Sequence, residues 1–358
     1  MRRALVATVV IGVVMVVGAG PALACGGLIG RNGAVNLERT TTLAAYKDGV
    51  EHYVTAFEFN GAGGEFGSIV PLPGVPTKVE KGGEWTLQRL QREVNPPAPE
   101  ANRFDAAGAA VAQKATVLIE ASIDALDLTV LEGGGKAVGD WARDHGFLLP
   151  PDSPEVLDFY AKRSPIFMAT RFNGERAAAR GSAVGDGTPI HLTIPTPNPW
   201  VPLRILALGQ QPDATVQADV FLLTEQRPAL LPSGNNAGFD LSRSEAASDS
   251  LLSDLRTDKG MEWVPASMWL SHLKIDTPAR ALKYDLAVDV SGNSPSPRAA
   301  GLPSALLPPV VSKTNLNGPL VVALFVAAGV LLVGAYLAGR TGPAGPGGRK
   351  QGPARVTA

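Results

Sequence analysis

Apolar and polar residues alternate along much of the chain, and this alternation predicts short β-strands joined by tight turns. Residues 40–46 combine Thr with apolar side chains, and Lys47-Asp48-Gly49 is a turn signal because Gly tolerates a positive φ. The run from His52 to Phe59 alternates again, so the two segments should pair as antiparallel strands. Further strands are predicted at Thr116–Ile123, Ala125–Leu131, Ile166–Phe172, Ile190–Ile194, Val201–Leu208, Val216–Thr224, Trp263–Ile275 and Tyr284–Val290.

Helical spacing is confined to a few short segments. Apolar residues recur every three or four positions in Trp85–Val94, Lys136–His145 and Ser153–Lys162, and an amphipathic helix is predicted between Arg243 and Arg256. Proline has no amide hydrogen, so the proline-containing run Phe66–Pro76 fits an edge strand that leaves the sheet better than a central one. The pattern therefore predicts an α+β fold, predominantly antiparallel β with a few short helices.

The N-terminal segment has the pattern of a secretory signal peptide. Arg2 and Arg3 precede an uncharged run over residues 4–17, and a small-x-small cleavage site ends at Ala24. A buried N-terminal helix is the alternative, but the run is apolar on every face. Cleavage would leave Cys25 at the new N-terminus, where it is a candidate for lipidation, for an intermolecular disulfide or for a free thiol.

A second apolar segment, Leu320–Ala338, predicts one C-terminal transmembrane helix. It contains no charged residue, and as a helix it would span about 28 Å, close to the hydrocarbon core of a bilayer. The residues after it are basic and contain no acid, which favours a cytoplasmic tail. A buried core helix is the alternative, although no polar side chain marks a solvent face. The predicted membrane-spanning residues include Leu320, Phe325, Gly329, Leu332 and Tyr336.

These segments predict a single-pass topology with the folded domain outside the cell. The Ser- and Pro-rich composition before the predicted helix is typical of an extended stalk. The predicted parts are a signal peptide at 1–24, an extracytoplasmic α+β domain at 25–290, a stalk at 291–317, a transmembrane helix at 318–339 and a basic cytoplasmic tail at 340–358.

Composition excludes some classes of function but identifies none. The chain has 358 residues, 45% of them hydrophobic and 18% charged, which is typical of a globular protein. There are 32 basic and 33 acidic residues, and six of the basic ones lie in the predicted signal and tail. The exported domain is therefore net acidic, which argues against a nucleic-acid partner. A single cysteine excludes an internal disulfide.

Motif searches assign no catalytic, cofactor-binding or metal-ligating residue. No Gly-x-Ser-x-Gly or His-Glu-x-x-His pattern occurs, and the four histidines lie far apart in the sequence. Residues 133–136 look like a phosphate loop but lack its earlier glycine and its hydroxyl residue, so a turn before a helix is predicted. The histidines are His52, His145, His191 and His272.

Two further groups of residues have a structural and a functional interpretation. The acidic stretch lacks the ligand spacing of a calcium loop and is interpreted as a solvated helix face. The tryptophans could contact carbohydrate or a partner, although aromatic residues at such spacing are more often core. The acidic residues are Asp240, Glu245, Asp249, Asp254 and Asp258, and the tryptophans are Trp85, Trp141, Trp200, Trp263 and Trp269.

Several short motifs resemble a family of exported bacterial proteins that is described only as a domain of unknown function. They are Ala24-Cys25-Gly26-Gly27, the Val-Pro-x-Pro-Gly-x-Pro run at residues 70–76, and Trp141 followed by Gly146-Phe147 and Leu149-Pro150. The resemblance spans most of the predicted domain but implies no reaction, ligand or site. Members often carry a second cysteine near the first, whereas Gly30 stands in that region here.

Two functions follow as alternatives. The first is a membrane-anchored binding or structural module of the bacterial cell envelope, whose partner is an envelope protein or polymer. The second is a cell-envelope hydrolase whose polar groups converge only in the fold. A pocket joining histidines or carboxylates within hydrogen-bond reach would favour the hydrolase. An exposed apolar patch without such groups would favour the module.

Overall fold

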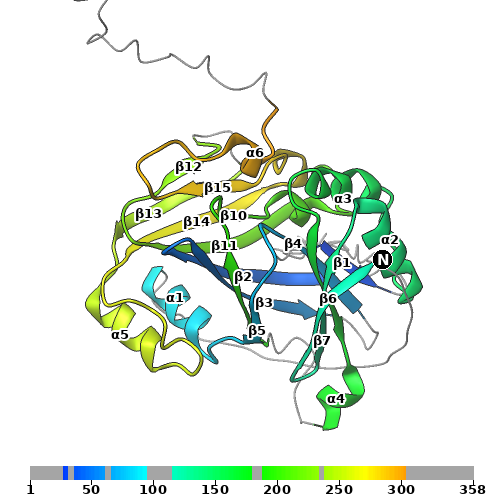
Figure 1. The fold of residues 1–358 in the computed structure, drawn as a ribbon, viewed down its shortest axis with the longest axis horizontal. Helices are drawn as coiled ribbons and strands as arrows, with labels where there is room; N and C mark the ends of the chain where they lie inside the picture. Colours follow the sequence, from blue (N-terminus) through cyan, green and yellow to red (C-terminus); the bar gives the residue numbers. More distant parts are fainter. Residues whose placement is uncertain are drawn as a thin grey trace, which may run out of the picture. The chain divides into compact units, whose positions relative to one another are not determined.

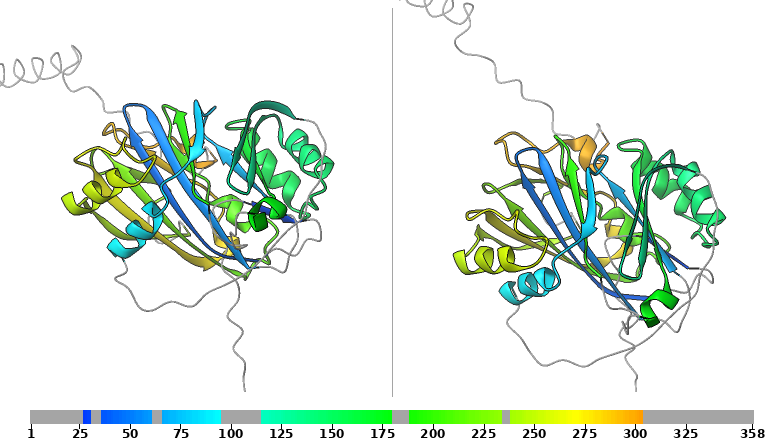
Figure 2. Two further views of the ribbon diagram at one scale, coloured as in Figure 1. Left: turned by 90° about the horizontal axis from the view of Figure 1, so that it is seen from below. Right: turned by 60° about the horizontal axis from the view of Figure 1, so that its bottom comes forward.

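Two β-sheets pack face to face at the centre of the structure, and each is covered on its outer side by helices (Figures 1 and 2). The computed structural model describes residues 27–30, 36–60, 66–94, 115–179, 188–233 and 238–303. Nearly all strand pairs within these ranges are antiparallel, and β2 with β11 is the parallel pair. The predicted α+β class with a mainly antiparallel sheet is therefore confirmed.

The larger sheet has seven strands in the order β13-β14-β11-β2-β3-β9-β5. The predicted hairpin is its centre: Tyr46 lies opposite Glu51, and the turn between the strands contains Asp48 and Gly49, both with positive φ. The strands are β2 (Asn36–Lys47), β3 (Val50–Asn60), β5 (Lys78–Lys81), β9 (Ile190–Pro195), β11 (Thr215–Thr224), β13 (Asp240–Ala246) and β14 (Trp269–Pro278).

The smaller sheet has five strands in the order β1-β4-β8-β7-β6, and it corrects the prediction of an edge strand at Phe66–Pro76. Strand β4 lies between β1 and β8, so its first half is paired on both sides. Pairing with β1 ends at Ile69, and Pro71 follows where β8 is the partner among the described strands, so its missing amide hydrogen disrupts no described bond to β1. The strands are β1 (Gly27–Gly30), β4 (Phe66–Leu72), β6 (Thr116–Ile123), β7 (Leu126–Glu132) and β8 (Ile166–Phe172).

A third, three-stranded sheet corrects the prediction of a long strand at Val201–Leu208. Only Trp200–Val201 is extended, as β10, and it pairs with β15 (Leu286–Asp289), which also pairs with β12 (Ala229–Leu231). Pro202 has no amide hydrogen for continued pairing, and the chain turns into the 3₁₀ helix η1 (Arg204–Ala207). Of the predicted strand, only its first residue, Val201, is therefore extended.

The helices are short, and the helix predicted between Arg243 and Arg256 is present only in the second half of that segment. Residues 243–246 belong to β13, and α5 starts afterwards, where the Ser248 hydroxyl accepts a hydrogen bond from the Leu251 amide. The amphipathic pattern between Arg243 and Arg256 thus covers a strand end and a helix. The helices are α1 (Thr86–Val94), α2 (Gly135–Asp144), α3 (Ser153–Ala161), α4 (Gly174–Ala179), α5 (Asp249–Thr257), η2 (Ala279–Ala281) and α6 (Pro297–Ala300).

Three apolar clusters hold these layers together. Val70, Leu128 and Leu222 belong to the cluster between the two sheets. A second cluster joins α2 and α3 to the outer face of the five-stranded sheet, and a third joins α1 and α5 to the outer face of the seven-stranded sheet. Burying each such side chain contributes about 1.5–3 kcal/mol, so the four layers stabilise one another.

The glycine run at residues 133–135 connects β7 to α2, as predicted, and its last residue, Gly135, begins the helix. A Cβ added to Gly135 would lie 2.6 Å from the backbone nitrogen of Asp158, so this glycine allows α2 and α3 to approach closely. Gly146 follows α2 with a φ of 81°, which is the conformation expected of a glycine that ends a helix. The glycine run therefore permits the close packing of α2 against α3.

The folded region extends beyond the predicted domain boundary at 290. Helix α6 falls in the segment expected to begin the stalk, and Ala299 and Ala300 are buried in the cluster around α3. None of the helices in the described ranges is long and apolar enough to cross a membrane. The predicted span Leu320–Ala338, the signal at 1–24, Cys25 and residues 304–317 lie outside the described residues.

Candidate functional site

Two of the four histidines meet on the outer face of the seven-stranded sheet. His52 on β3 and His191 on β9 share a hydrogen bond of 2.9 Å between Nδ1 and Nε2. The other ring nitrogen of His191 lies 3.4 Å from a carboxylate oxygen of Glu80 on β5. The Trp263 indole stacks on His52 with the ring centroids 3.8 Å apart. Adjacent strands thus place residues distant in sequence in one row.

Burial makes this histidine pair neutral near pH 7. It lowers the pKa of His191 to about 4, and Lys78 acts in the same direction. Burial also lowers the pKa of His52 to about 4, helped by His191 and opposed by Glu80. A neutral pair can share one hydrogen bond in either direction, so the row is suited to moving a proton between rings.

A third histidine is part of a second polar row on the same face of the sheet. His272 Nε2 lies 2.7 Å from Asp219 Oδ1, and its Nδ1 lies 2.6 Å from the Ser242 hydroxyl. The Gln91 amide of α1 donates to the other Asp219 oxygen at 3.0 Å and to the Thr41 hydroxyl at 2.9 Å. Asp219 and His272 are buried, whereas Ser242 is exposed.

Strand register explains this second row. On β11 and β14, the pair Asp219–Lys274 lies two positions from the pair Phe221–His272, so Asp219 and His272 are diagonal neighbours on one face. Phe221, directly opposite His272, stacks on its ring at 4.7 Å. The register of β13 shifts between Leu241 and Arg243, so Ser242 is the extra residue of a β-bulge. Bulges redirect side chains, and this one directs the hydroxyl toward the ring.

The fourth histidine, His145, lies apart from these rows and lines a cavity of about 330 Å³. Strands β6, β7 and β8 and helix α2 form the walls, and Trp141, Arg171 and Glu120 are among the lining residues. The Trp141 and His145 rings stack at 3.8 Å, and His145 Nδ1 lies 2.7 Å from the Trp141 carbonyl oxygen. A volume of this size is within the range of small-ligand sites.

Asp127, in the wall of this cavity, is the centre of an ion-pair network. Arg171 and Arg176 both donate to Asp127, at 3.3 and 2.8 Å. Burial would raise the pKa of Asp127, but hydrogen bonds from Arg176, Ser122 and Arg171 outweigh it and hold the pKa below its usual range. Asp127 therefore stays ionised, and the cavity presents both charges and hydroxyl groups to a ligand.

A buried carboxyl group lies inside the fold at Glu51. Its side chain is on the same face of β3 as Tyr53, which packs between the two sheets, and the residue is 1% exposed. Burial raises the pKa of Glu51 to about 8, and the Trp200 backbone opposes this rise only in part. Neither carboxyl oxygen has a hydrogen-bond partner within the described ranges. Glu51 is therefore protonated at neutral pH.

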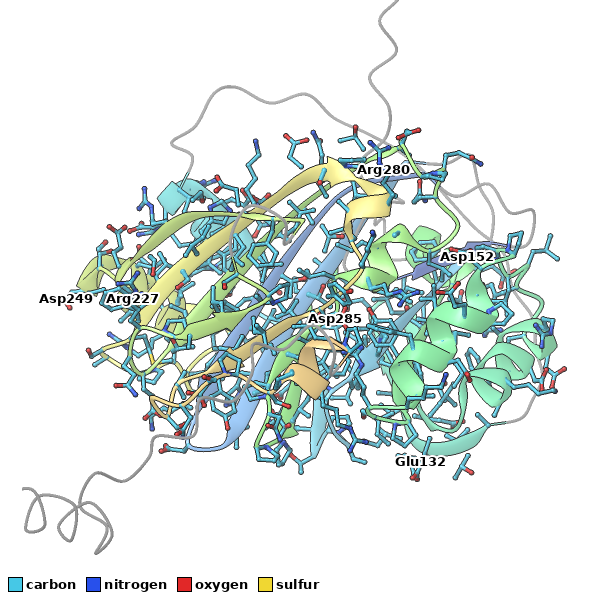
Figure 3. The ribbon with its side chains drawn as sticks, turned by 90° about the horizontal axis from the view of Figure 1, so that it is seen from above. Glu132, Asp152, Arg227, Asp249, Arg280 and Asp285 are labelled. Carbon is cyan, nitrogen blue, oxygen red and sulfur yellow. The ribbon has the colours of Figure 1, made fainter. Side chains whose placement is uncertain are left out.

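Asp285 is the main buried ionic centre, and its role is structural. Figure 3 shows it near the middle of the molecule, close to α6. It accepts hydrogen bonds from the Tyr160 hydroxyl at 2.8 Å and from the Leu203 and Arg204 amides at 2.8 and 2.9 Å, and it pairs with Arg163. This carboxylate thereby holds α3, η1 and β15 together.

The other residues singled out in the sequence are dispersed. Asp258 caps α1 by accepting from the Glu84 and Trp85 amides, and Asp254 pairs with Arg89 of that helix. Across the described residues, no group of three or more His, Cys, Asp or Glu side chains is arranged to hold a metal ion. Among the tryptophans, Trp141 and Trp200 are core residues, whereas Trp85 is 38% exposed.

Sequence reasoning missed Ser242, Asp219 and Glu51 as members of polar sites. Asp219 interrupts the apolar strand at residues 216–224, and Glu51 directly precedes the alternating run His52–Phe59, in phase with Tyr53. A charged residue at an inward position of a strand is the signal that could have found both, because burial of an unpaired charge is costly. Ser242 gave no comparable signal, since its role depends on a register shift.

Fold and site together define an α+β protein built on two packed, mainly antiparallel sheets. Over residues 19–261 the chain matches the family described as "Uncharacterized protein conserved in bacteria (DUF2330)", and it belongs to that family. This confirms the resemblance to a bacterial family of unknown function. No curated protein matches the chain. Among solved structures, the crystal structure of baculovirus P35 matches with 10% identity and a TM-score of 0.38, covering 72% of this chain and 97% of that chain.

Proposed function

We propose that this protein is a membrane-anchored, extracytoplasmic binding module of the bacterial cell envelope. The basic and apolar start of the chain and the uncharged run Leu320–Ala338 support export followed by anchoring at the C-terminal end. The family match supports the bacterial part of this proposal. In this proposal the anchor fixes the location, and the folded domain contacts its ligand outside the membrane.

The observation that carries the binding role is the cavity beside Trp141. Arg171 offers nitrogen donors, and Glu120 and Asp127 offer carboxylate acceptors. His145 donates from Nδ1 to the Trp141 carbonyl oxygen, so its Nε2 offers a further acceptor. A ligand rich in hydroxyl or amide groups matches such mixed chemistry, because each of its groups can both donate and accept. Envelope polysaccharide has these properties, so we take a glycan of the cell envelope as the ligand.

The edge of the five-stranded sheet lies next to this cavity. Strand β6 is the last strand in the sheet order, and it contributes Glu120 to the cavity wall. Val117 and Leu118 on the same strand are 43% and 36% exposed. An edge with exposed apolar residues gives an extended polymer a surface to follow beyond the cavity itself.

Binding is tested by sedimentation of the purified full-length chain with isolated cell-wall fragments. We expect the wild-type chain to sediment and Arg171→Gln to bind about tenfold more weakly, because the cavity loses a charged donor. Arg227→Gln is the matched control, since Arg227 is exposed and does not line the cavity (Figure 3). Equal binding by the two variants, or no sedimentation of the wild-type chain, would contradict the proposed site.

Location is tested separately by protease treatment of intact cells that express the chain with a tag on its tail. We expect the folded domain to be degraded and the tagged tail to survive inside the cell. Survival of the whole domain with loss of the tail would reverse the proposed topology.

A further inference from the structure

Ser242, His272 and Asp219 form an unbroken row of hydrogen bonds across strands β13, β14 and β11. The two bonds measure 2.6 and 2.7 Å, which are short values for side-chain contacts. The buried carboxylate is fixed by the Gln91 amide, and the imidazole is fixed by stacking on Phe221. The row therefore has the order nucleophile, base and orienting acid that activates a serine.

The direction of the hydrogen bonds agrees with this order. A carboxylate only accepts, so the neutral imidazole of His272 carries its proton on Nε2 and donates it to Asp219. Nδ1 is then unprotonated and faces the Ser242 hydroxyl. The hydroxyl proton can be donated to Nδ1 at 2.6 Å or to the His272 carbonyl oxygen at 3.2 Å, and the shorter contact favours the ring.

Ser242 is also accessible to a substrate. It lies on β13, the first strand in the order of the seven-stranded sheet, and it is exposed although the ring that it contacts is buried. An edge strand presents backbone N–H groups that have no partner in its own sheet. Such groups beside Ser242 can hydrogen-bond the oxygen of a substrate carbonyl.

A cavity of about 600 Å³ extends from the same two strands. Asp240 and Lys274 line it, and each lies two residues from a member of the row, about 7 Å along its strand. Arg280, near the end of β14 in Figure 3, also lines the cavity. One half of a substrate bound at Ser242 thus has space beside it, in charged surroundings.

We propose that Ser242 is the nucleophile of a carboxylic-ester hydrolase site, with His272 as general base and acid and Asp219 as its positioning residue. The polar part of the ester occupies the neighbouring cavity. This site is on the opposite side of the fold from the cavity beside Trp141, and it goes beyond the proposed binding function. The family match ends at residue 261, so the inference concerns this chain, whose His272 lies further on.

The reaction proceeds by two acyl transfers, with water as the co-substrate. The Ser242 oxygen attacks the ester carbonyl carbon while its proton moves to His272 Nδ1, and Asp219 stabilises the imidazolium that forms. Collapse of the tetrahedral adduct breaks the carbon–oxygen bond to the alcohol, which leaves with the proton from Nδ1. Water then attacks the acyl-serine and gives its proton to Nδ1, and the carboxylic acid departs as the proton returns to Ser242.

The site is tested with a fluorescent fluorophosphonate probe and with p-nitrophenyl butyrate, using the purified full-length chain in detergent. We expect the probe to attach to Ser242, located by mass spectrometry of the labelled peptide. Ser242→Ala should lose the label and about 100-fold or more of the ester turnover. Ser244→Ala is the matched control, because Ser244 is on the same strand but is hydrogen-bonded to Trp269 and not to a histidine.

The proposed positioning role of Asp219 is tested with measurements besides loss of activity. We expect Asp219→Asn to lower kcat and the labelling rate about 100-fold, with KM and the thermal unfolding midpoint close to those of the wild type. Asp219→Glu should recover part of the labelling. An unlabelled but folded wild-type chain, or equal turnover by Ser242→Ala and Ser244→Ala, would overturn the proposal. These measurements do not depend on where the protein resides in the cell.

Discussion

The buried carboxyl group of Glu51 makes a quantitative prediction about folding stability. The residue is 1% exposed, and its carboxyl oxygens have no hydrogen-bond partner among the described residues. Replacing Glu51 by Gln keeps the shape of the side chain and removes its ability to ionise. The variant should therefore separate the effect of ionisation from the effect of packing.

The sign follows from where each state binds its proton. The unfolded carboxyl ionises near the ordinary value of 4.5, whereas burial raises the pKa in the folded chain to about 8. Stability from the protonated form is fully present below pH 4.5 and is lost as the pH rises toward 8. At about 1.36 kcal/mol per pH unit, the folded wild-type chain should lose about 2.5 kcal/mol from this group between pH 5 and pH 7.

The assay is urea unfolding followed by tryptophan fluorescence at both pH values, with the full-length chain in mild detergent. The free energy of unfolding of Glu51→Gln, minus that of the wild type, should grow by about 2.5 kcal/mol from pH 5 to pH 7. Glu132→Gln removes an exposed carboxylate and should stay within about 0.5 kcal/mol of the wild type. A difference between Glu51→Gln and the wild type that does not change with pH would refute the reasoning.

Two further predictions concern stability. Asp285→Asn should cost about 3–5 kcal/mol in urea unfolding, because it leaves the buried Arg163 charge unpaired, whereas Asp158→Asn, in an exposed pair with Lys162, should cost less than about 1 kcal/mol. Equal costs would contradict the role given to Asp285. Burial lowers the pKa of His191 to about 4, so the folded chain disfavours its protonated form. The contribution of neutral His191 to the free energy of unfolding is fully present above pH 6.5. It should fall by about 3 kcal/mol as the pH drops from 6.5 toward 4. Urea unfolding at these pH values should show a flatter profile for His191→Gln, and an unchanged profile would exclude His191 as the source.

Much of the fold was predictable because local patterns and tertiary contacts agree. The turn at Asp48 and Gly49 requires positive φ, and the flanking alternation sets which faces are buried, so the hairpin followed from local residues alone. The edge-strand and long-strand predictions were wrong at Phe66–Pro76 and Val201–Leu208. In both cases the path of the chain near a proline depends on a residue or strand that is distant in sequence. Pairing of β4 with β1 ends at Ile69, just before Pro71. After Pro202, the next two amides donate to Asp285.

The polar rows were not predictable, since each joins strands that are distant in the chain. His52 and His191 meet only because β9 pairs with β3, and Ser242 reaches His272 only because a bulge displaces it. A single sequence gives the composition of these strands but not their order in the sheet. The histidines were candidates without partners, and the fold supplies the partners.

The central proposal, a domain held at the membrane by residues 320–338, is tested most directly by fractionation without detergent. The full-length chain and a variant lacking residues 320–338 are expressed in the native host, and each lysate is centrifuged. The account predicts that the full-length chain sediments with the membranes and that the shortened chain stays in the supernatant. Recovery of the full-length chain in the supernatant would contradict it.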